Sequence, residues 1–198
     1  MAMTPRSSQS LVPFVAGTKK VLNDLFLLLR HPYLLPIEFV DVLTQQRNAV
    51  IMWRLVVDGS LRDLIHRDAN PIHRATKKYG TSIGRPLPPK KIFLYTRQIV
   101  EALLFLRSKQ LPHRNLHAGN VIVDRGVCRL VGYESCIFGL KPRLSRLVAK
   151  LRPLEDANVK VDSRFDILCL GHIIFEMGLG YELASNRPDV EHLVGKCG

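Results

Sequence analysis

Cysteine is scarce in this sequence, and the few cysteines form no recognisable site. The four cysteines of the 198-residue chain are Cys128, Cys136, Cys169 and Cys197. None belongs to a CxxC pair, and no cluster of cysteine and histidine has the spacing of a zinc site. We therefore expect no metal site, and reduced, mostly buried thiols of the kind found in cytosolic proteins.

Long apolar runs are missing as well. No stretch approaches the ~18 consecutive apolar residues of a membrane-spanning helix. The N-terminal segment MAMTPRSSQS also lacks the apolar run of a signal peptide. We therefore expect a cytoplasmic protein that meets membranes only peripherally, if at all.

Acidic residues are few compared with basic ones. The chain has 17 Asp and Glu against 29 Lys and Arg, which gives a net charge of +12. Such a charge favours acidic protein segments, anionic lipids or nucleic acid as partners, but it also fits a solvated surface that keeps the protein soluble. Hydrophobic residues make up 46% of the chain and charged residues 23%, so we expect one globular domain rather than a disordered chain.

The first part of the chain predicts a helix followed by two strands. Residues 1–17 are rich in Ser, Thr, Pro and Gly, which favours a flexible arm. Residues 18–30 have a helical pattern that Pro32 ends. Residues 34–43 and 49–57 are typical of strands, and the polar stretch between them predicts an antiparallel hairpin.

The second part is expected to be mainly helical. Residues 66–91 contain seven Lys or Arg and one acidic residue, which predicts a basic insertion. Residues 90–109 have the apolar spacing of an amphipathic helix. Two short apolar strands follow this helix, and the turn at residues 124–126 joins them into a predicted hairpin. The last strong element, RFDILCLGHIIFEMG, is an apolar helix that contains Asp166. A carboxylate buried there would need hydrogen-bond donors.

A motif between the long helix and the hairpin points to a known fold. The stretch His113-Arg114-Asn115-Leu116, with Asn120 after it, matches the HRDLxxxN catalytic loop of protein kinases, except that Asn115 replaces the aspartate. A long helix before the motif and a strand after it are the context expected for that loop. The sequence therefore resembles a protein kinase.

Two further motifs fit the same resemblance. Gly132-Tyr133-Glu134 follows the hairpin, where the DFG motif of a kinase would stand. Asp166 and Gly171 have the spacing of the DxWSxG motif of the large central kinase helix. The resemblance implies that Asp166 accepts backbone N–H groups from the catalytic loop, which is an architectural role rather than a catalytic one.

Longer segments narrow the resemblance to one family. LHAGNVIV, GVCRLVGYES, LGHIIFEM and RHPYLLP resemble the PX-domain kinase-like proteins and the slowpoke-binding proteins. The similarity covers about residues 20–180. It implies an α+β kinase-like fold, with residues 18–57 as a partial N-lobe and residues 58–198 as a partial, mainly helical C-lobe.

The resemblance also implies that the phosphotransfer chemistry has been lost. Phosphotransfer needs residues that hold the phosphates, ligands that position Mg²⁺, and a group that accepts the proton of the attacking hydroxyl. Asn115 is neutral and cannot act as a base, Gly132 has no side chain to bind Mg²⁺, and Asn120 alone makes a poor Mg²⁺ site. No glycine-rich loop or VAIK-like strand is recognisable before residue 20. The helix carboxylate of a kinase aligns best with Leu22, and Asn23 or Asp24 could take its place only through a shift in register. We therefore expect no ATP or Mg²⁺ cofactor.

Three functions remain as hypotheses. The resemblance implies a pseudokinase that serves as a protein-binding scaffold or regulator, with partners such as ion channels or pumps and their regulators. The alternative is a weakly active or ATP-binding serine/threonine kinase. A nucleic-acid-binding module ranks last, because the sequence has no recognised binding motif and no interleaving of basic and aromatic residues. The basic segments 66–91 and 141–164 are expected to bind an acidic partner or an anionic membrane surface peripherally.

Overall fold

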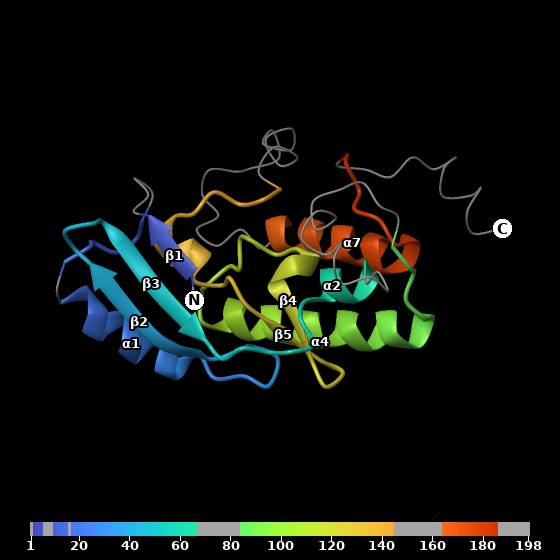
Figure 1. The fold of residues 1–198 in the computed structure, drawn as a ribbon, viewed down its shortest axis with the longest axis horizontal. Helices are drawn as coiled ribbons and strands as arrows, with labels where there is room; N and C mark the ends of the chain where they lie inside the picture. Colours follow the sequence, from blue (N-terminus) through green and yellow to red (C-terminus); the bar gives the residue numbers. More distant parts are fainter. Residues whose placement is uncertain (1, 6–9, 16, 67–83, 145–163, 186–198) are drawn as a thin grey trace.

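The fold consists of a small sheet with one helix and a mainly helical part beside it (Figure 1). The structure is a computed structural model that describes residues 2–5, 10–15, 17–66, 84–144 and 164–185. The architecture is α+β, as the sequence predicts. Among the described residues, no helix is long and apolar enough to cross a membrane.

The N-terminal sheet has three antiparallel strands in the order β1-β3-β2. Strands β2 (Ile37–Leu43) and β3 (Asn48–Trp53) form the predicted hairpin. Helix α1 (Thr18–Leu28) packs against β2 and buries Leu22 and Phe26. Both strands alternate between buried and more exposed residues, so one face of the sheet contributes to the core.

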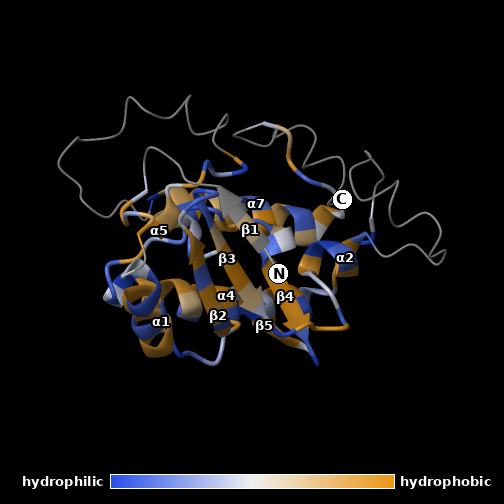
Figure 2. Ribbon diagram, turned by 60° about the vertical axis from the view of Figure 1, so that its left-hand side comes forward, coloured by the Kyte–Doolittle hydropathy of each residue, from blue (hydrophilic) through white to orange (hydrophobic). Residues whose placement is uncertain are grey.

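The C-terminal part is built on two packed helices, α4 (Pro89–Ser108) and α7 (Arg164–Leu179). Strands β4 (Val121–Asp124) and β5 (Val127–Leu130) form a second antiparallel pair, and β5 packs against α4. The short helix α2 (Leu61–Ile65) packs against β4. Figure 2 shows β4 as mostly hydrophobic, whereas α1 carries both hydrophilic and hydrophobic residues.

The two parts are joined by backbone hydrogen bonds. Leu130 N–H donates to Tyr33 O over 2.9 Å, and Leu35 N–H donates to Leu130 O over 2.9 Å. On the other side of the hairpin, Val123 N–H donates to Gly59 O over 3.0 Å. The hairpin β4–β5 is therefore held at both edges by the chain that enters and leaves the N-terminal sheet.

The N-terminal segment differs from the flexible arm predicted for residues 1–17. Residues Ala2–Pro5 form strand β1, which pairs with β3, and Phe14 is buried in the core. The sequence pattern missed this strand because an edge strand of four residues is specified by pairing with β3 rather than by its own alternation.

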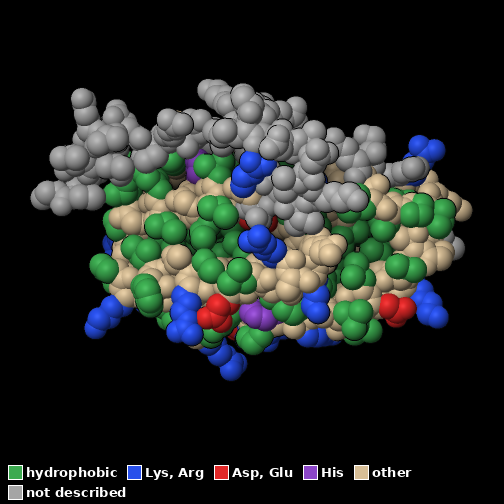
Figure 3. All heavy atoms as spheres, turned by 180° about the vertical axis from the view of Figure 1, so that it is seen from behind, with side chains coloured by type: hydrophobic (Ala, Val, Ile, Leu, Met, Phe, Trp, Pro, Cys, Tyr) green, Lys and Arg blue, Asp and Glu red, His purple; other side chains and the backbone are tan. Residues whose placement is uncertain are grey.

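The predicted basic segments lie largely outside the described residues. Of residues 66–91, the structure describes residue 66 and then residue 84 onward; of residues 141–164, it describes 141–144 and 164. The end of the first segment is not an irregular loop, because α4 already begins at Pro89. Seen from behind, the described surface carries hydrophobic side chains beside Lys and Arg (Figure 3).

A close backbone contact joins the chain before α4 to the end of α7. Gly84 N–H donates to Gly180 O over 2.6 Å, and Arg85 N–H donates to Ile65 O over 2.8 Å. A Cβ atom on Gly84 would lie 2.4 Å from Ile65 O, which is a backbone atom that cannot rotate away. This contact therefore requires glycine at position 84.

We predict that Gly84→Ala lowers the free energy of unfolding by about 1–3 kcal/mol, the usual cost of overpacking. Gly171→Ala is the matched control, because Gly171 lies on an exposed side of α7 with no heavy atom within 4 Å of the added Cβ. Alanine there should stabilise the helix by up to about 1 kcal/mol. Urea unfolding of both variants measures the difference. Equal midpoints for Gly84→Ala and the wild type would contradict the contact.

Candidate functional site

Asp166 fastens the loop that carries the HRN motif to helix α7. Its carboxylate is 5% exposed and accepts two backbone hydrogen bonds, from His113 N–H and Arg114 N–H, each over 2.8 Å. Arg114 has a φ of 62°, so the loop bends sharply where the two donors converge. A buried carboxylate is stable when such charge-assisted bonds replace its water.

The ring of His113 is a buried, neutral part of the same loop. Its Nδ1 accepts from Asn115 N–H over 3.3 Å, so Nε2 carries the proton and donates to Val131 O over 3.0 Å. Burial lowers the pKa of His113 to about 4, because the charged form would lose its hydration. The ring therefore joins the loop to the strand end that precedes Gly132.

Tyr133 connects this loop region to helix α1 and to the chain just before β2. Its hydroxyl donates to Leu35 O over 3.0 Å, and its ring meets the ring of Phe26 edge to face, with 6.3 Å between the centroids. Phe26, Tyr133 and His113 are all buried. The contact between Phe26 and Tyr133 therefore joins helix α1 directly to the segment after β5.

Asn115, Asn120 and Gly132 form a tight group of amides and backbone. Asn120 Nδ2 donates to Asn115 O over 2.8 Å, and Asn115 Oδ1 accepts from Arg143 N–H over 3.1 Å. Gly132 has a φ of 83°, and a Cβ on it would lie 2.6 Å from Asn120 Nδ2. Any side chain at position 132 would have to displace an amide that is already hydrogen-bonded.

Glu134 is a buried carboxylate beside this group. Its side chain is 4% exposed, and Oε2 has no hydrogen-bond partner among the described residues. Burial raises the pKa of Glu134 from 4.5 to about 7, although the backbone N–H groups of Glu134 and Gly132 oppose the shift. Burial therefore favours the protonated, neutral form of Glu134 over a wider pH range than for an exposed glutamate.

These residues do not fit a Mg²⁺ site. Mg²⁺ prefers carboxylate and phosphate oxygens in an octahedral arrangement, and the group offers two amides, a glycine and one buried carboxylate. No three His, Cys, Asp or Glu side chains gather as a metal site within the described ranges. The arrangement holds the loop together and presents no open set of ligands.

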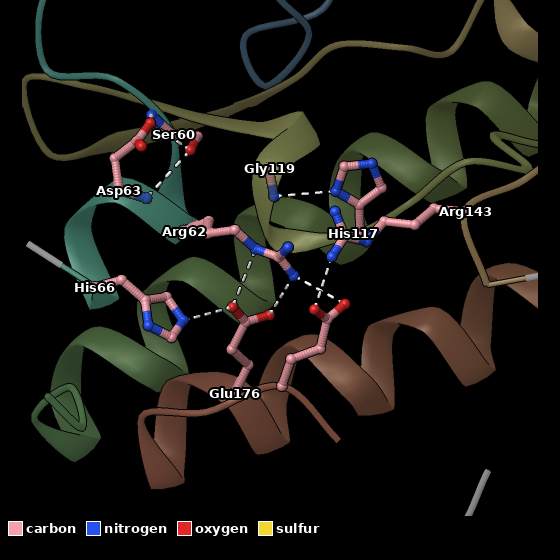
Figure 4. A network of polar contacts seen from close by, with 9 residues as sticks. Ser60, Arg62, Asp63, His66, His117, Gly119, Arg143 and Glu176 are labelled. Atoms are coloured by element: carbon pink, nitrogen blue, oxygen red, sulfur yellow. Dashed lines mark hydrogen bonds and ion pairs between the residues drawn. The ribbon is translucent and has the colours of Figure 1, made fainter. Parts of the chain in front are cut away.

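A network of charged residues lies beside the loop (Figure 4), and the sequence alone does not predict it. Glu176 on α7 is buried and lies 3.1 Å from His66 Nε2 and 3.3 Å from Arg62 Nη2. Glu182 lies 2.9 Å from Arg62 and 2.8 Å from Arg143. Glu176 could have indicated this network, since it is a second carboxylate in the apolar helix that contains Asp166 and would need a partner there.

His117 lies at the edge of this network and stays neutral. Its Nδ1 accepts from Gly119 N–H over 3.1 Å. Burial, and after it the nearby cations of Arg143 and Arg62, lower the pKa of His117 to about 3. His117 is thus hydrogen-bonded within its own loop, whereas the ion pairs of Glu176 and Glu182 connect α2 and Arg143 to α7 and the residues that follow it.

Comparison with known proteins relates most of the chain to protein kinases. The model of the family "Protein tyrosine and serine/threonine kinase" matches residues 19–145. The slowpoke-binding protein of Drosophila melanogaster is 35% identical over 181 residues, which cover 88% of this chain and 33% of the relative. The "Probable inactive serine/threonine-protein kinase slob2" of Dictyostelium discoideum is 34% identical over 186 residues, or 92% of this chain and 30% of that protein.

Two further comparisons agree in fold. The PX domain-containing protein kinase-like protein of Mus musculus is 32% identical over 151 residues, which cover 76% of this chain and 25% of the relative. A crystal structure of the Mycobacterium tuberculosis PknI kinase domain superposes with a TM-score of 0.58 at 16% identity, covering 87% of this chain and 60% of that chain. The chain spans about a third of the length of the curated relatives. The predicted kinase-like fold is thereby confirmed.

We predict that Asp166→Ala strongly destabilises the fold. The substitution leaves two buried backbone donors without acceptors, at about 1–3 kcal/mol each. Asp24→Ala is the control, because Asp24 is exposed on α1, and it should change stability little. Thermal unfolding followed by circular dichroism measures both. An unchanged midpoint for Asp166→Ala would show that the loop does not depend on this carboxylate.

We predict that Glu134 makes the protein less stable as pH rises. Its pKa of about 7 in the folded state exceeds its ordinary value of 4.5, so the folded state binds the extra proton between these values. Its contribution to the free energy of unfolding therefore falls as pH rises from about 4.5 to 7, by roughly 3 kcal/mol in all.

Glu134→Gln removes this titration while keeping the shape of the side chain. The variant should gain stability over the wild type at pH 8 and show little difference at pH 4.5, measured by urea unfolding across that range. A gain of the same size at both pH values would mean that the carboxylate does not titrate with a raised pKa.

Proposed function

Because the chain belongs to the protein tyrosine and serine/threonine kinase family, we propose that it is a pseudokinase, a kinase-like domain that binds other proteins and transfers no phosphate. The observation that carries this proposal is the contact between Asn120 and Gly132. In a kinase, the metal-binding aspartate would stand in this place. Here we assign the place to Gly132 and to the hydrogen-bonded amide of Asn120 beside it.

The position of Asn115 in the loop supports the same proposal. In a kinase the aspartate of the catalytic loop accepts the proton of the attacking hydroxyl. Asn115 stands at that position, and both ends of its amide are engaged, with Oδ1 on Arg143 N–H and Nδ2 3.5 Å from Ser135 Oγ. A neutral amide has no basic lone pair that could take up a proton at neutral pH.

The described strands of the N-terminal sheet offer no lysine that could hold a phosphate. Strand β1 lies beside β3 and has the sequence Ala-Met-Thr-Pro, with no lysine. The buried face of α1 consists of Thr18, Leu22 and Phe26, so it presents no carboxylate to pair with such a lysine. In kinases the pairing of that lysine with a glutamate on the helix must be in place for transfer.

What the site retains is support for a rigid shape. Asp166 still fixes the loop, Tyr133 still joins the two parts, and Glu176 ties α2 to α7. A rigid fold without chemistry suits a binding scaffold, because preorganised surfaces bind at a lower entropic cost. A relative is named a slowpoke-binding protein, which supports a protein partner for this chain, with a membrane channel or pump as the class of partner that we propose.

Glu134 favours one alternative, a weakly active or ATP-binding serine/threonine kinase. Its carboxylate is two residues from Gly132, has an unpartnered oxygen among the described residues and lies in the same loop region as Asn120. To bind Mg²⁺, it would have to lose its proton and leave a buried position, at a free-energy cost that the raised pKa reflects.

We predict that the chain transfers no phosphate and shows no thermal shift with Mg²⁺ and ATP at concentrations that saturate an active kinase. The double variant Asn115→Asp/Gly132→Asp should stay inactive, because the groups of a catalytic site act as a unit. A radiolabelled transfer assay and a thermal-shift titration, each run beside an active kinase, measure this. Magnesium-dependent transfer that Glu134→Gln abolishes would establish the alternative.

A further inference from the structure

The outer face of α4 carries an apolar stripe that the core does not use. Phe93, Leu94 and Leu104 are 74%, 43% and 57% exposed. Phe93 and Leu104 are eleven residues apart, so they lie almost in line along the helix. The opposite face is the one that packs inward, and its buried residues are Tyr95, Gln98, Ile99, Ala102 and Leu106.

The same face is strongly basic. Lys90, Arg97 and Arg107 are exposed on it, and Lys91 and Lys109 stand exposed at the two ends of the helix. Glu101 is the one acidic residue of α4, and it is paired with Arg97 over 2.8 Å. The helix therefore presents phenylalanine and leucine side chains surrounded by an excess of positive charge.

The shape of this surface is a ridge rather than a pocket. Helix α4 has 20 residues, which corresponds to about 30 Å, and it lies along the lower edge of the molecule in Figure 1. Seen from behind, Lys and Arg side chains are spaced along the same lower edge (Figure 3). A long convex edge can lie on a flat partner without a matching groove.

The charge and the apolar side chains together select the partner. A second copy of the chain would bring a basic ridge against another basic ridge, so self-association through this face is disfavoured. Protruding Phe and Leu side chains flanked by Lys and Arg are the features by which interfacial helices bind anionic lipid, with the apolar groups below the headgroups and the cations among the phosphates.

We propose that the outer face of α4 binds an anionic membrane surface, with Phe93 and Leu104 inserted at the headgroup level and Lys90 and Arg107 on acidic headgroups. This site is separate from the HRN loop and does not depend on the absence of phosphotransfer. It would hold the scaffold at the membrane with α4 against the lipid and the N-terminal sheet free for another partner.

Co-sedimentation of the full chain with vesicles tests the proposal. The protein should sediment with vesicles of phosphatidylcholine and phosphatidylserine and stay in solution with phosphatidylcholine alone. Binding should weaken as salt is raised from about 0.1 M to 0.5 M, because screening shortens the reach of the charges. Failure to bind the phosphatidylserine vesicles at the lower salt concentration would overturn the proposal.

Two double variants separate the apolar and charged contributions. Lys90→Gln/Arg107→Gln should weaken binding about fivefold for each charge removed, and Phe93→Ser/Leu104→Ser should weaken it at least about tenfold. The control is Leu55→Ser/Val57→Ser, which removes two apolar side chains that are more exposed than any on α4. It should bind as the wild type does. Equal losses in the control and in the α4 variants would mean unspecific hydrophobic adsorption and overturn the assignment.

An acidic peptide provides the last arm of the test. A glutamate-rich amphipathic helix is titrated against the wild type and both α4 variants by fluorescence anisotropy. Binding of this peptide that the α4 variants lose, without binding to phosphatidylserine vesicles, would assign the face to a protein partner and overturn the membrane proposal. Vesicle binding that the peptide cannot displace supports it.

Discussion

The structure depends on one buried carboxylate that accepts two backbone N–H groups. Asp166 is placed in an apolar helix, where an unpaired charge would be prohibitive, and the N–H groups of His113 and Arg114 make its burial possible. That pair of bonds sets the position of the loop on α7. The loop then places His113 against Val131, which fixes the start of the segment Gly132-Tyr133-Glu134. From this segment, the hydroxyl of Tyr133 donates to Leu35 in the N-terminal part.

The same geometry separates fold from chemistry. The bonds that hold the loop come from backbone groups, so they survive a change of side chain at position 115. We propose that Asn115 and Gly132 stand where the chemistry of a kinase would need carboxylates, and the amide of Asn120 packs into the space beside Gly132. A kinase-like shape can therefore persist while its reaction is lost, which is the situation that we propose here.

The sequence predicts the features that depend on local pattern. The sequence predicts a helix at 90–109 because the apolar spacing there is regular, and α4 begins one residue earlier, at Pro89. Asp166 stood out because a charge in an apolar helix needs an explanation. Strand β1 was missed because its four residues pair with a distant strand. The ion pair of Arg62 with Glu176 was missed because 114 positions separate the partners, and no local pattern links them.

We propose that the loop around Asn115, Asn120 and Gly132 binds no metal and no nucleotide. The most direct measurement is a crystal structure of the protein grown with Mn²⁺ and a non-hydrolysable ATP analogue, with an anomalous map at the manganese edge. We expect no anomalous peak in the loop, with Asn120 Nδ2 still on Asn115 O. A manganese peak between Asn120 and Glu134, with phosphate oxygens beside it, would show that the loop binds a metal and a nucleotide.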